Sequence, residues 1–358
     1  MVNEHKSLFE SVQRYFLLLV IAVSLFIILS YVLSMGLGIV IFFSTPEGLE
    51  FSHRSIVLNP LLVQEFEVTL NVSVYFLFLW WIFALCFIAA SRLRESLHSK
   101  FVGFMSKDRS SPWSSNLLTM PALAAMLLTF IIVLEALQKQ GGLPSGELPV
   151  REPFLSFLLV SQAPIIEEFL FRIIPFALFF VTFTSLARRS PSFSLSPSRL
   201  KSFLMLILRP DEAKRALGLK NIGEDGLLGG LSVAEWVMVL STSSLFGIAH
   251  FLSGWGLGKI TQASLIGVVF ALSYLYYGIQ APILLHWFFN YYFEVFALAN
   301  ELFKIRILEY VWSMNILFGF LIWAALASLC VISLVVHLSK KLGSASEQSS
   351  RIVPSEVP

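Results

Sequence analysis

Long apolar stretches separated by short polar ones occupy most of the chain. A helix needs about 20 mainly apolar residues to cross a lipid bilayer. Five stretches of about this length or longer contain no Asp, Glu, Lys or Arg: Tyr15–Pro46, Val68–Ser91, Ser110–Leu134, Trp236–Gly258 and Tyr310–Ser339. Each of these five stretches predicts a transmembrane helix.

Two further apolar stretches need a separate interpretation. Pro153–Ala187 holds three charged residues, and we expect Pro164 and Pro175 to kink this helix. The stretch that begins at Ile260 is too long for one span, and Gly278, Gln280 and Pro282 divide it into spans near Ile260–Tyr277 and Ala281–Leu298. The pattern therefore predicts an all-α, polytopic membrane bundle of about eight transmembrane helices.

The composition excludes several other classes of protein. Of the 358 residues, 56% are hydrophobic and 13% are charged, whereas a soluble domain carries about 25% charged residues. Soluble, disordered and disulfide-rich secreted folds are therefore excluded. The net charge of +2 predicts no nucleic-acid partner, and membrane lipids are the expected surroundings. Cys86 and Cys330 lie in apolar runs, so we interpret them as packing residues.

The distribution of Lys and Arg predicts the orientation of the chain. With eight spans, 18 of these residues fall on the side of both termini, six fall on the other side, and Arg172 lies within a span. Basic residues favour the cytoplasmic side. We therefore predict a multi-pass membrane protein with cytoplasmic termini, in a prokaryotic cell membrane or, in a eukaryote, the endoplasmic reticulum.

Three charged residues lie inside the predicted Pro153–Ala187 span. Ionisable groups at membrane depth are costly and usually face a cavity or one another. Glu168 and Arg172 are four residues apart on one helix face, where an ion pair is expected. Glu167 points roughly 100° away around the same helix. One carboxylate can therefore be paired with Arg172 while the other acts as a general base.

Two later spans each contribute a histidine. His250 lies in the Trp236–Gly258 span, and His286 and Asn290 lie one turn apart in the next-but-one span. Taken singly, such residues often only join helices by hydrogen bonds. Because three helices each bring catalytic-type groups into hydrocarbon, we predict one site inside the bundle.

The sequence lacks the motifs of several other classes of hydrolase. All three aspartates fall in loops, and neither HExxH nor GxSxG occurs. A glutamate base that activates water, with imidazoles and an amide donor for the oxyanion, is chemically complete for peptide hydrolysis. Glu167, His250 and His286 would also make an open zinc site. The sequence leaves both alternatives open.

Three motifs carry a resemblance to a known family. EExxxR at Glu167–Arg172, FxxxH at Phe246–His250 and HxxxN at His286–Asn290 occur in this order on separate apolar stretches. The segment Phe154–Leu298 thereby resembles the CAAX protease and bacteriocin-processing (CPBP, or Abi) family of eight-helix intramembrane proteases. Its characterised members cleave prenylated proteins near the C-terminus, and some members are associated with bacteriocin immunity.

The resemblance implies a role for each matched residue. Glu167 corresponds to the general base, and Glu168 and Arg172 to its supporting pair. His250 and His286 correspond to the histidines that hold the catalytic water or a metal, and Asn290 to the oxyanion donor. The family is classed with metalloproteases, although a metal-free glutamate mechanism has also been argued for it. Zinc therefore stays an alternative, and a membrane-anchored protein or peptide, prenylated or not, is the expected substrate.

Two alternative functions belong to other classes. One is a non-catalytic membrane scaffold or immunity protein that binds peptide or lipid. The other is a proton-coupled transporter, which is disfavoured because no inverted repeat is visible. One feature conflicts with a single site: His250 falls near the far end of its span, whereas His286 falls near the cytoplasmic end of its own.

The chain is accordingly divided into five parts. A capping box formed by Ser232 and Glu235 marks the start of a helix after a basic loop. The predicted parts are a cytoplasmic N-terminus (1–14), three transmembrane helices with their loops (15–152), the catalytic core (153–300, with a cytoplasmic loop at 188–231), the last transmembrane helix (301–339) and a disordered cytoplasmic tail (340–358).

Overall fold

The computed structural model describes residues 2–58, 68–92, 116–146, 152–188, 204–205, 207–216, 220 and 229–351. Its elements in chain order are α1 (Val2–Ser44), α2 (Pro46–Ser52), β1 (Ser55–Leu58), β2 (Val68–Asn71), α3 (Val72–Arg92), α5 (Asn116–Gln140), α6 (Pro153–Glu168), η2 (Phe169–Ile173), α7 (Ile174–Arg188), α9 (Pro210–Ala216), α10 (Val233–Leu252), α11 (Leu257–Tyr277), α12 (Gln280–Trp287), η3 (Phe288–Tyr292), α13 (Phe293–Phe303) and α14 (Ile307–Arg351). The predicted all-α membrane fold is confirmed.

Six of the described helices are long and apolar enough to cross a membrane: Ser11–Ser44, Val72–Arg92, Leu117–Gln140, Val233–Leu252, Leu257–Tyr277 and Ile307–Ser339. The two other predicted spans are composite. A π-helical segment joins two α-helices in each, giving α6–η2–α7 and α12–η3–α13. The protein is therefore an integral membrane protein, and its two interrupted spans are the ones that carry most of the predicted site.

The π-helical segment of the first composite span lies between the two prolines that we expected to kink it. Pro175 lacks an N–H donor, and its ring conflicts with the carbonyl group four residues earlier. A wider turn relieves this conflict, and the Ile174 N–H donates to the Phe169 carbonyl, five residues back. The chain therefore continues as a helix past Pro175.

Two short strands precede α3 and were not predicted. β1 pairs antiparallel with β2, with Ser55 opposite Asn71. The span that we predicted from Val68 therefore begins only at Val72. Val and Thr favour strands, and apolarity alone does not separate a short strand from the start of a helix.

The C-terminal region also differs from the prediction. We predicted disorder from Lys340, but α14 continues as a helix to Arg351. Because extending an existing helix costs less than starting one, Ala, Glu, Gln and Leu in this polar segment suffice to prolong it. Residues 352–358, the 93–115 loop and most of the 188–231 loop lie outside the described residues.

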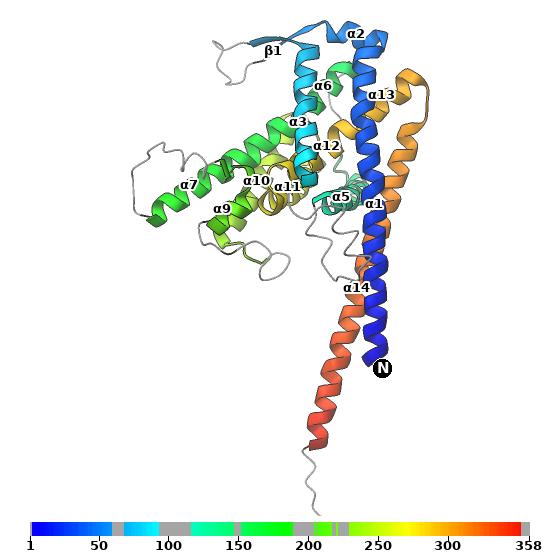
Figure 1. The fold of residues 1–358 in the computed structure, drawn as a ribbon, viewed down its shortest axis with the longest axis vertical. Coiled ribbons are helices and arrows are strands. Elements are labelled where there is room, and N and C mark those ends of the chain that lie inside the picture. Colours follow the sequence, from blue (N-terminus) through cyan, green and yellow to red (C-terminus); the bar gives the residue numbers. More distant parts are fainter. Residues whose placement is uncertain are drawn as a thin grey trace, which may run out of the picture.

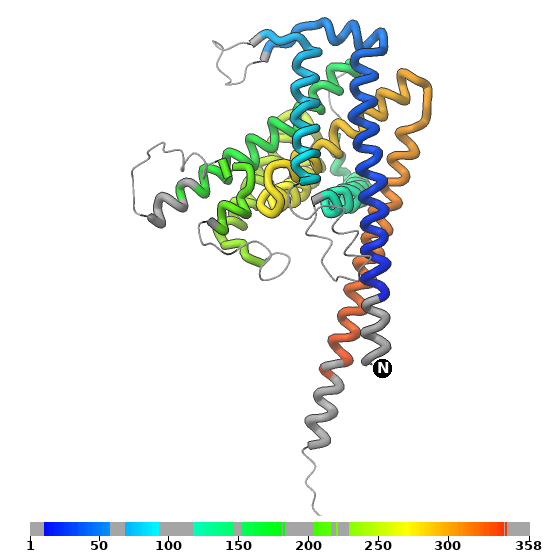
Figure 2. Tube along the Cα trace, viewed as in Figure 1, coloured from blue at the N-terminus to red at the C-terminus, as the bar shows by residue number. Residues whose placement is uncertain are grey.

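The long helices set the shape of the molecule. α1 and α14 lie side by side and antiparallel, so that the start of α1 and the end of α14 share one end of the molecule (Figure 1). α7, α9, α10 and α11 lie to one side of this pair (Figure 2). α5 crosses the direction of α1 and α3 and is seen nearly end-on (Figure 1). The helices of the bundle are therefore strongly tilted relative to one another.

Buried apolar side chains form two clusters. The larger one joins α1, α3, α5, α6, α12 and α14, and the smaller one joins η2, α7, α10 and α11. Phe157 and Leu158 of α6 belong to the first cluster, and Ile173 and Phe176 to the second. The EExxxR motif therefore lies where the chain passes from one cluster to the other.

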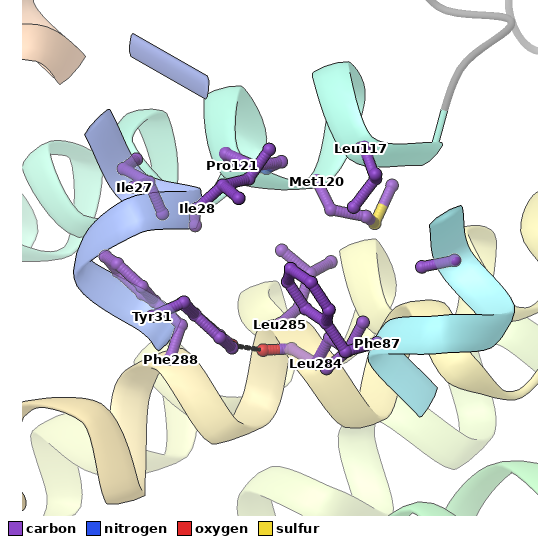
Figure 3. A pocket seen from close by; sticks show the side chains of 12 residues that line it. Ile27, Ile28, Tyr31, Phe87, Leu117, Met120, Pro121, Leu284, Leu285 and Phe288 are labelled. Atoms are coloured by element: carbon purple, nitrogen blue, oxygen red, sulfur yellow. Dashed lines mark hydrogen bonds between the residues drawn. The ribbon is translucent and has the colours of Figure 1, made fainter. Parts of the chain in front are cut away.

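A small apolar cavity lies behind α12. It has a volume of about 30 Å³, and Figure 3 shows Ile27, Met120 and Leu285 among the side chains that line it. The Tyr31 hydroxyl beside it donates to the Leu284 carbonyl. The groups that line the cavity are almost all apolar, and apolar cavities of this kind stay dry. We interpret it as a packing gap rather than a ligand site.

The predicted capping box at the start of α10 is confirmed. The Glu235 N–H donates to the Ser232 hydroxyl (3.2 Å), and the Ser232 N–H donates to the Glu235 carboxylate (2.7 Å). The same carboxylate forms a buried ion pair with Lys214 of α9, with 2.6 Å between Nζ and Oε1. The described part of the basic loop is thereby fixed to the first turn of α10.

Candidate active site

The two adjacent glutamates end α6 and have different surroundings. The Glu168 side chain is fully buried, and its Oε1 lies 3.1 Å from Nη1 of Arg172, which is also fully buried. The predicted ion pair is therefore present. The Glu167 side chain is 28% exposed and lies on the side of the helix that faces the two histidines. Of the two carboxylates, only that of Glu167 can be reached from outside the helix packing.

Arg172 joins the helices that build the site. Its guanidinium lies 4.2 Å from the ring centre of Phe246 on α10 and 5.5 Å from that of Phe270 on α11. It also donates to the Gly267 carbonyl of α11 at 3.4 Å. These contacts and the ion pair with Glu168 compensate most of the cost of burying the charge, although Nε of Arg172 and Oε2 of Glu168 have no hydrogen-bond partner among the described residues.

His286 connects the two glutamates. Its Nδ1 lies 2.8 Å from Oε1 of Glu168, and its Nε2 lies 3.5 Å from Oε2 of Glu167. Because Glu168, which is paired with Arg172, is the acceptor of this hydrogen bond, the Nδ1–H donates to it, and the tautomer of the imidazole is fixed. Nε2 therefore presents a lone pair towards Glu167.

His250 approaches Glu167 from the opposite helix. Its Nδ1–H donates to the Phe246 carbonyl, 2.9 Å away and one turn earlier on α10. This hydrogen bond leaves Nε2 as an acceptor, 3.9 Å from Oε2 of Glu167. The Phe246 ring packs edge-on against the rings of both histidines, with centres 4.5 Å and 5.8 Å away.

Three acceptor atoms thus converge at one point: Oε2 of Glu167 and Nε2 of both histidines. Oε2 of Glu167 is buried and has no hydrogen-bond partner among the described residues. A buried acceptor without a donor is unfavourable. A water molecule can donate to two of these acceptors at once. The geometry is therefore suited to holding and polarising a water.

Asn290 completes the site from η3. Its Nδ2 lies 3.4 Å from Nε2 of His286. An amide NH₂ has two hydrogens, and because the one lone pair of His286 Nε2 faces the water position, the amide is available to donate to a substrate oxygen. All six residues predicted from the sequence, from EExxxR, FxxxH and HxxxN, are therefore brought together in one place.

The metal alternative requires Glu167, His250 and His286 to surround one ion. Zinc lies about 2.0–2.2 Å from nitrogen and oxygen ligands. In the part of the chain that the structure describes, no group of three or more His, Cys, Asp or Glu side chains is arranged to hold a metal ion. These side chains therefore do not fit zinc in the arrangement seen here, and no step is derived through a metal.

Two residues of the site were not predicted. Phe270 packs beside His286 with its ring tilted by 35° and the ring centres 5.1 Å apart, and Gly267 allows the Arg172 guanidinium to approach α11. A Cβ at Gly267 would lie 3.1 Å from Nη2 of Arg172 and from the Ser243 Cβ. In the sequence both residues are ordinary members of an apolar stretch, which carries no signal of their role.

The two histidines lie at the same carboxylate, although different depths were expected for them. His250 belongs to the last turn of α10, and His286 to the last turn of the eight-residue α12. The elements around them run diagonally past the upright α1 and α3 (Figure 1). The packing of these elements brings Nε2 of both histidines within 4 Å of Oε2 of Glu167.

Comparison with known families agrees with the motifs. Residues 149–292 match the family model of the type II CAAX prenyl endopeptidases that is described as Rce1-like. The predicted resemblance to the CAAX protease family is confirmed for this segment. No curated protein and no solved structure matches the chain. The Rce1-like segment covers every element that carries a residue of the site, from α6 to η3, and supports a CAAX-type intramembrane endopeptidase activity in general terms.

Proposed function

We propose that this protein is an intramembrane endopeptidase that hydrolyses a peptide bond near the C-terminus of membrane-anchored proteins, including prenylated CaaX proteins. The observation that carries the proposal is the convergence of Glu167, His250 and His286, with Oε2 3.5 Å and 3.9 Å from the two Nε2 atoms. The Rce1-like match of residues 149–292 supports the same reaction class.

In the proposed mechanism Glu167 is the general base. A water held between its carboxylate and the two imidazoles loses a proton to Glu167 as its oxygen attacks the scissile carbonyl carbon. The carbonyl oxygen becomes an oxyanion, and the free N–H of Asn290 donates to it. Collapse of the tetrahedral intermediate breaks the C–N bond, and the proton on Glu167 passes to the leaving amine.

The Glu168–Arg172 pair acts through His286. Because Glu168 accepts from Nδ1 at 2.8 Å, the imidazole keeps its orientation and its Nε2 lone pair. Arg172 holds the Glu168 carboxylate in place through their ion pair, so that both are positioning residues. The two adjacent glutamates therefore have separate roles, one on the water and one on the histidine.

The proposed substrate and location follow from the site lying within the bundle. A site among membrane helices is reached most easily by a substrate that is itself held at the bilayer, which a prenyl group would provide. Membrane lipids are then direct neighbours of the enzyme, in a prokaryotic cell membrane or the endoplasmic reticulum, with both termini cytoplasmic. No nucleic-acid partner is proposed.

The test is hydrolysis by purified protein in lipid vesicles. Farnesylated and unmodified peptides with a C-terminal CaaX sequence are incubated with the wild type, with Glu167→Gln and with Glu301→Gln, and the products are identified by mass spectrometry. Because a general base contributes about 10²–10⁴-fold, we expect Glu167→Gln to lose at least 100-fold in kcat at unchanged expression.

Glu301→Gln is the matched control, because this carboxylate is exposed near the end of α13. We expect it to retain wild-type turnover. Near-normal hydrolysis by Glu167→Gln would show that this carboxylate is not the base. Absence of hydrolysis of all peptides by the wild type would contradict the proposed substrate class.

A further inference from the structure

A lysine and a tryptophan lie beside His250. The rings of His250 and Trp255 are 6.4 Å apart between centres. The ammonium of Lys259, two residues into α11 from its first residue, lies 4.3 Å from the Trp255 ring centre. This is the distance of a cation–π contact. A fixed positive charge therefore lies next to the candidate catalytic residues, on an element that carries none of them.

The charge of Lys259 is not neutralised by a close carboxylate. Among the described residues it forms no ion pair within 4.0 Å, unlike Arg172 and Lys214. Glu135 and Glu167 are its electrostatic neighbours at longer range. The side chain is half-buried. A partly desolvated cation of this kind can gain a charge-assisted hydrogen bond from an incoming anion.

The segment that presents the lysine is rigidly held. The Gly256 N–H donates to the Ser145 carbonyl at 2.9 Å, and the Gly258 N–H donates to the Pro144 carbonyl at 3.1 Å. Gln138 of α5 donates to the Gly258 carbonyl at 3.0 Å. A Cβ at Gly256 would lie 2.2 Å from the Pro144 carbonyl oxygen, so this contact requires glycine. The start of α11 is thereby fixed relative to α5.

We propose that Lys259 binds the C-terminal carboxylate of the peptide substrate, an inference that rests on the proposed function. The scissile bond of the substrate must lie at Glu167 while the C-terminal carboxylate of the same substrate contacts a cation. Three extended residues span at most about 10 Å. Successive contacts from Glu167 to His250 (3.9 Å), from the His250 ring to the Trp255 ring (6.4 Å) and from Trp255 to Lys259 (4.3 Å) connect the base to the cation. Glu167 and Lys259 are also electrostatic neighbours.

A contact between Lys259 and the terminal carboxylate would let the enzyme distinguish a peptide bond near the chain end from an internal one. A substrate with a C-terminal amide or extension presents no carboxylate at this position. The catalytic residues would still contact its scissile bond, but Lys259 would lack its partner. We therefore expect kcat/KM to differ between substrates that differ only in their C-terminal group.

The test compares one farnesylated CaaX peptide as its free acid and as its C-terminal amide, with the enzyme in lipid vesicles. We expect the wild type to prefer the acid by about 10–100-fold in kcat/KM, as for hydrogen bonds to charged groups. Lys259→Met should abolish the preference and Lys259→Arg should largely keep it. Lys304→Met, at an exposed cation after α13, is the matched control and should keep it fully.

The outcomes separate this inference from the proposed function. If the wild type cleaves both peptides equally, or if Lys259→Met keeps the preference, the inference is wrong while Glu167-dependent hydrolysis still supports the proposed function. If the wild type cleaves neither peptide, both are wrong. If Lys259→Met does not accumulate, the inference is judged by the wild type alone, from the ratio of kcat/KM for the acid peptide to kcat/KM for the amide peptide.

Discussion

At the scale of single residues, the site depends on a buried charge pair that contacts no substrate in the proposed mechanism. Arg172 and Glu168 are both fully buried, and the arginine contacts α10 and α11 as well as its own helix. Removing one partner of a buried pair leaves the other charge uncompensated, which costs more than the pair itself contributes.

We expect Arg172→Ala to lower the free energy of unfolding by about 3–5 kcal/mol. Its thermal unfolding in detergent is compared with that of Arg209→Ala, which breaks a partly exposed pair with Glu212 and should cost at most about 1 kcal/mol. Equal stability of the two variants would show that the buried pair is not a structural requirement.

The question of a catalytic metal also belongs to this scale. Because the three donor side chains do not fit a metal ion as they are placed, we expect a strong chelator to leave hydrolysis nearly unchanged. We expect His250→Gln and His286→Gln to slow turnover without changing the metal content of the purified protein. Stoichiometric zinc that is lost together with activity, and restores activity when returned, would contradict this expectation.

At the scale of elements, the site requires α10 and α11 to pack very closely. A Cβ at Gly247 of α10 would lie 2.1 Å from Oγ of Ser264 and 2.4 Å from the Ile260 carbonyl oxygen, both on α11. His250 lies less than one turn further along α10. Glycine at this position therefore sets the distance at which the histidine approaches Glu167.

We expect Gly247→Ala to destabilise the protein by about 1–3 kcal/mol, as for overpacked cores, and to reduce kcat at least tenfold because His250 is displaced. Gly36→Ala in α1 is the matched control, since no atom lies within 4 Å of its added Cβ. This control should be neutral or more stable by about 0.5–1 kcal/mol. Equal kcat and stability of the two variants would contradict the role of this contact.

At the scale of the whole molecule, the antiparallel pair of α1 and α14 brings the two ends of the chain to the same end of the bundle (Figure 1). This arrangement agrees with the even number of predicted spans. Which side of the membrane these ends occupy depends on the distribution of Lys and Arg, with 18 on the side of the termini and six on the other.

We expect single cysteines at Ser196 and Ser346 to resist membrane-impermeant thiol reagents in intact cells, because both positions are predicted to be cytoplasmic. A cysteine at Ser55 in β1, which is exposed at the opposite end, should react. The natural Cys86 and Cys330 are replaced by alanine in all variants. Labelling of Ser346→Cys from outside would overturn the predicted orientation.

The sequence by itself determined the membrane class, the approximate spans and the six residues of the candidate site. It could do so because charged and imidazole side chains within hydrocarbon are too costly to occur without partners. The ion pair of Glu168 with Arg172 followed from their spacing on one helix turn. The strands before α3 and the extent of α14 did not follow, because hydropathy does not encode backbone pairing or helix ends.

Only the tertiary structure decided which role each residue of the site can have. Packing between helices brings His250 and His286 to the same carboxylate, although their places along the spans had predicted different depths. The contacts of Glu168 with Arg172 and His286 leave Glu167 as the carboxylate that faces both Nε2 atoms. Phe270, Gly267 and Lys259 join the site through packing between helices, and such contacts leave no pattern in the sequence of one helix.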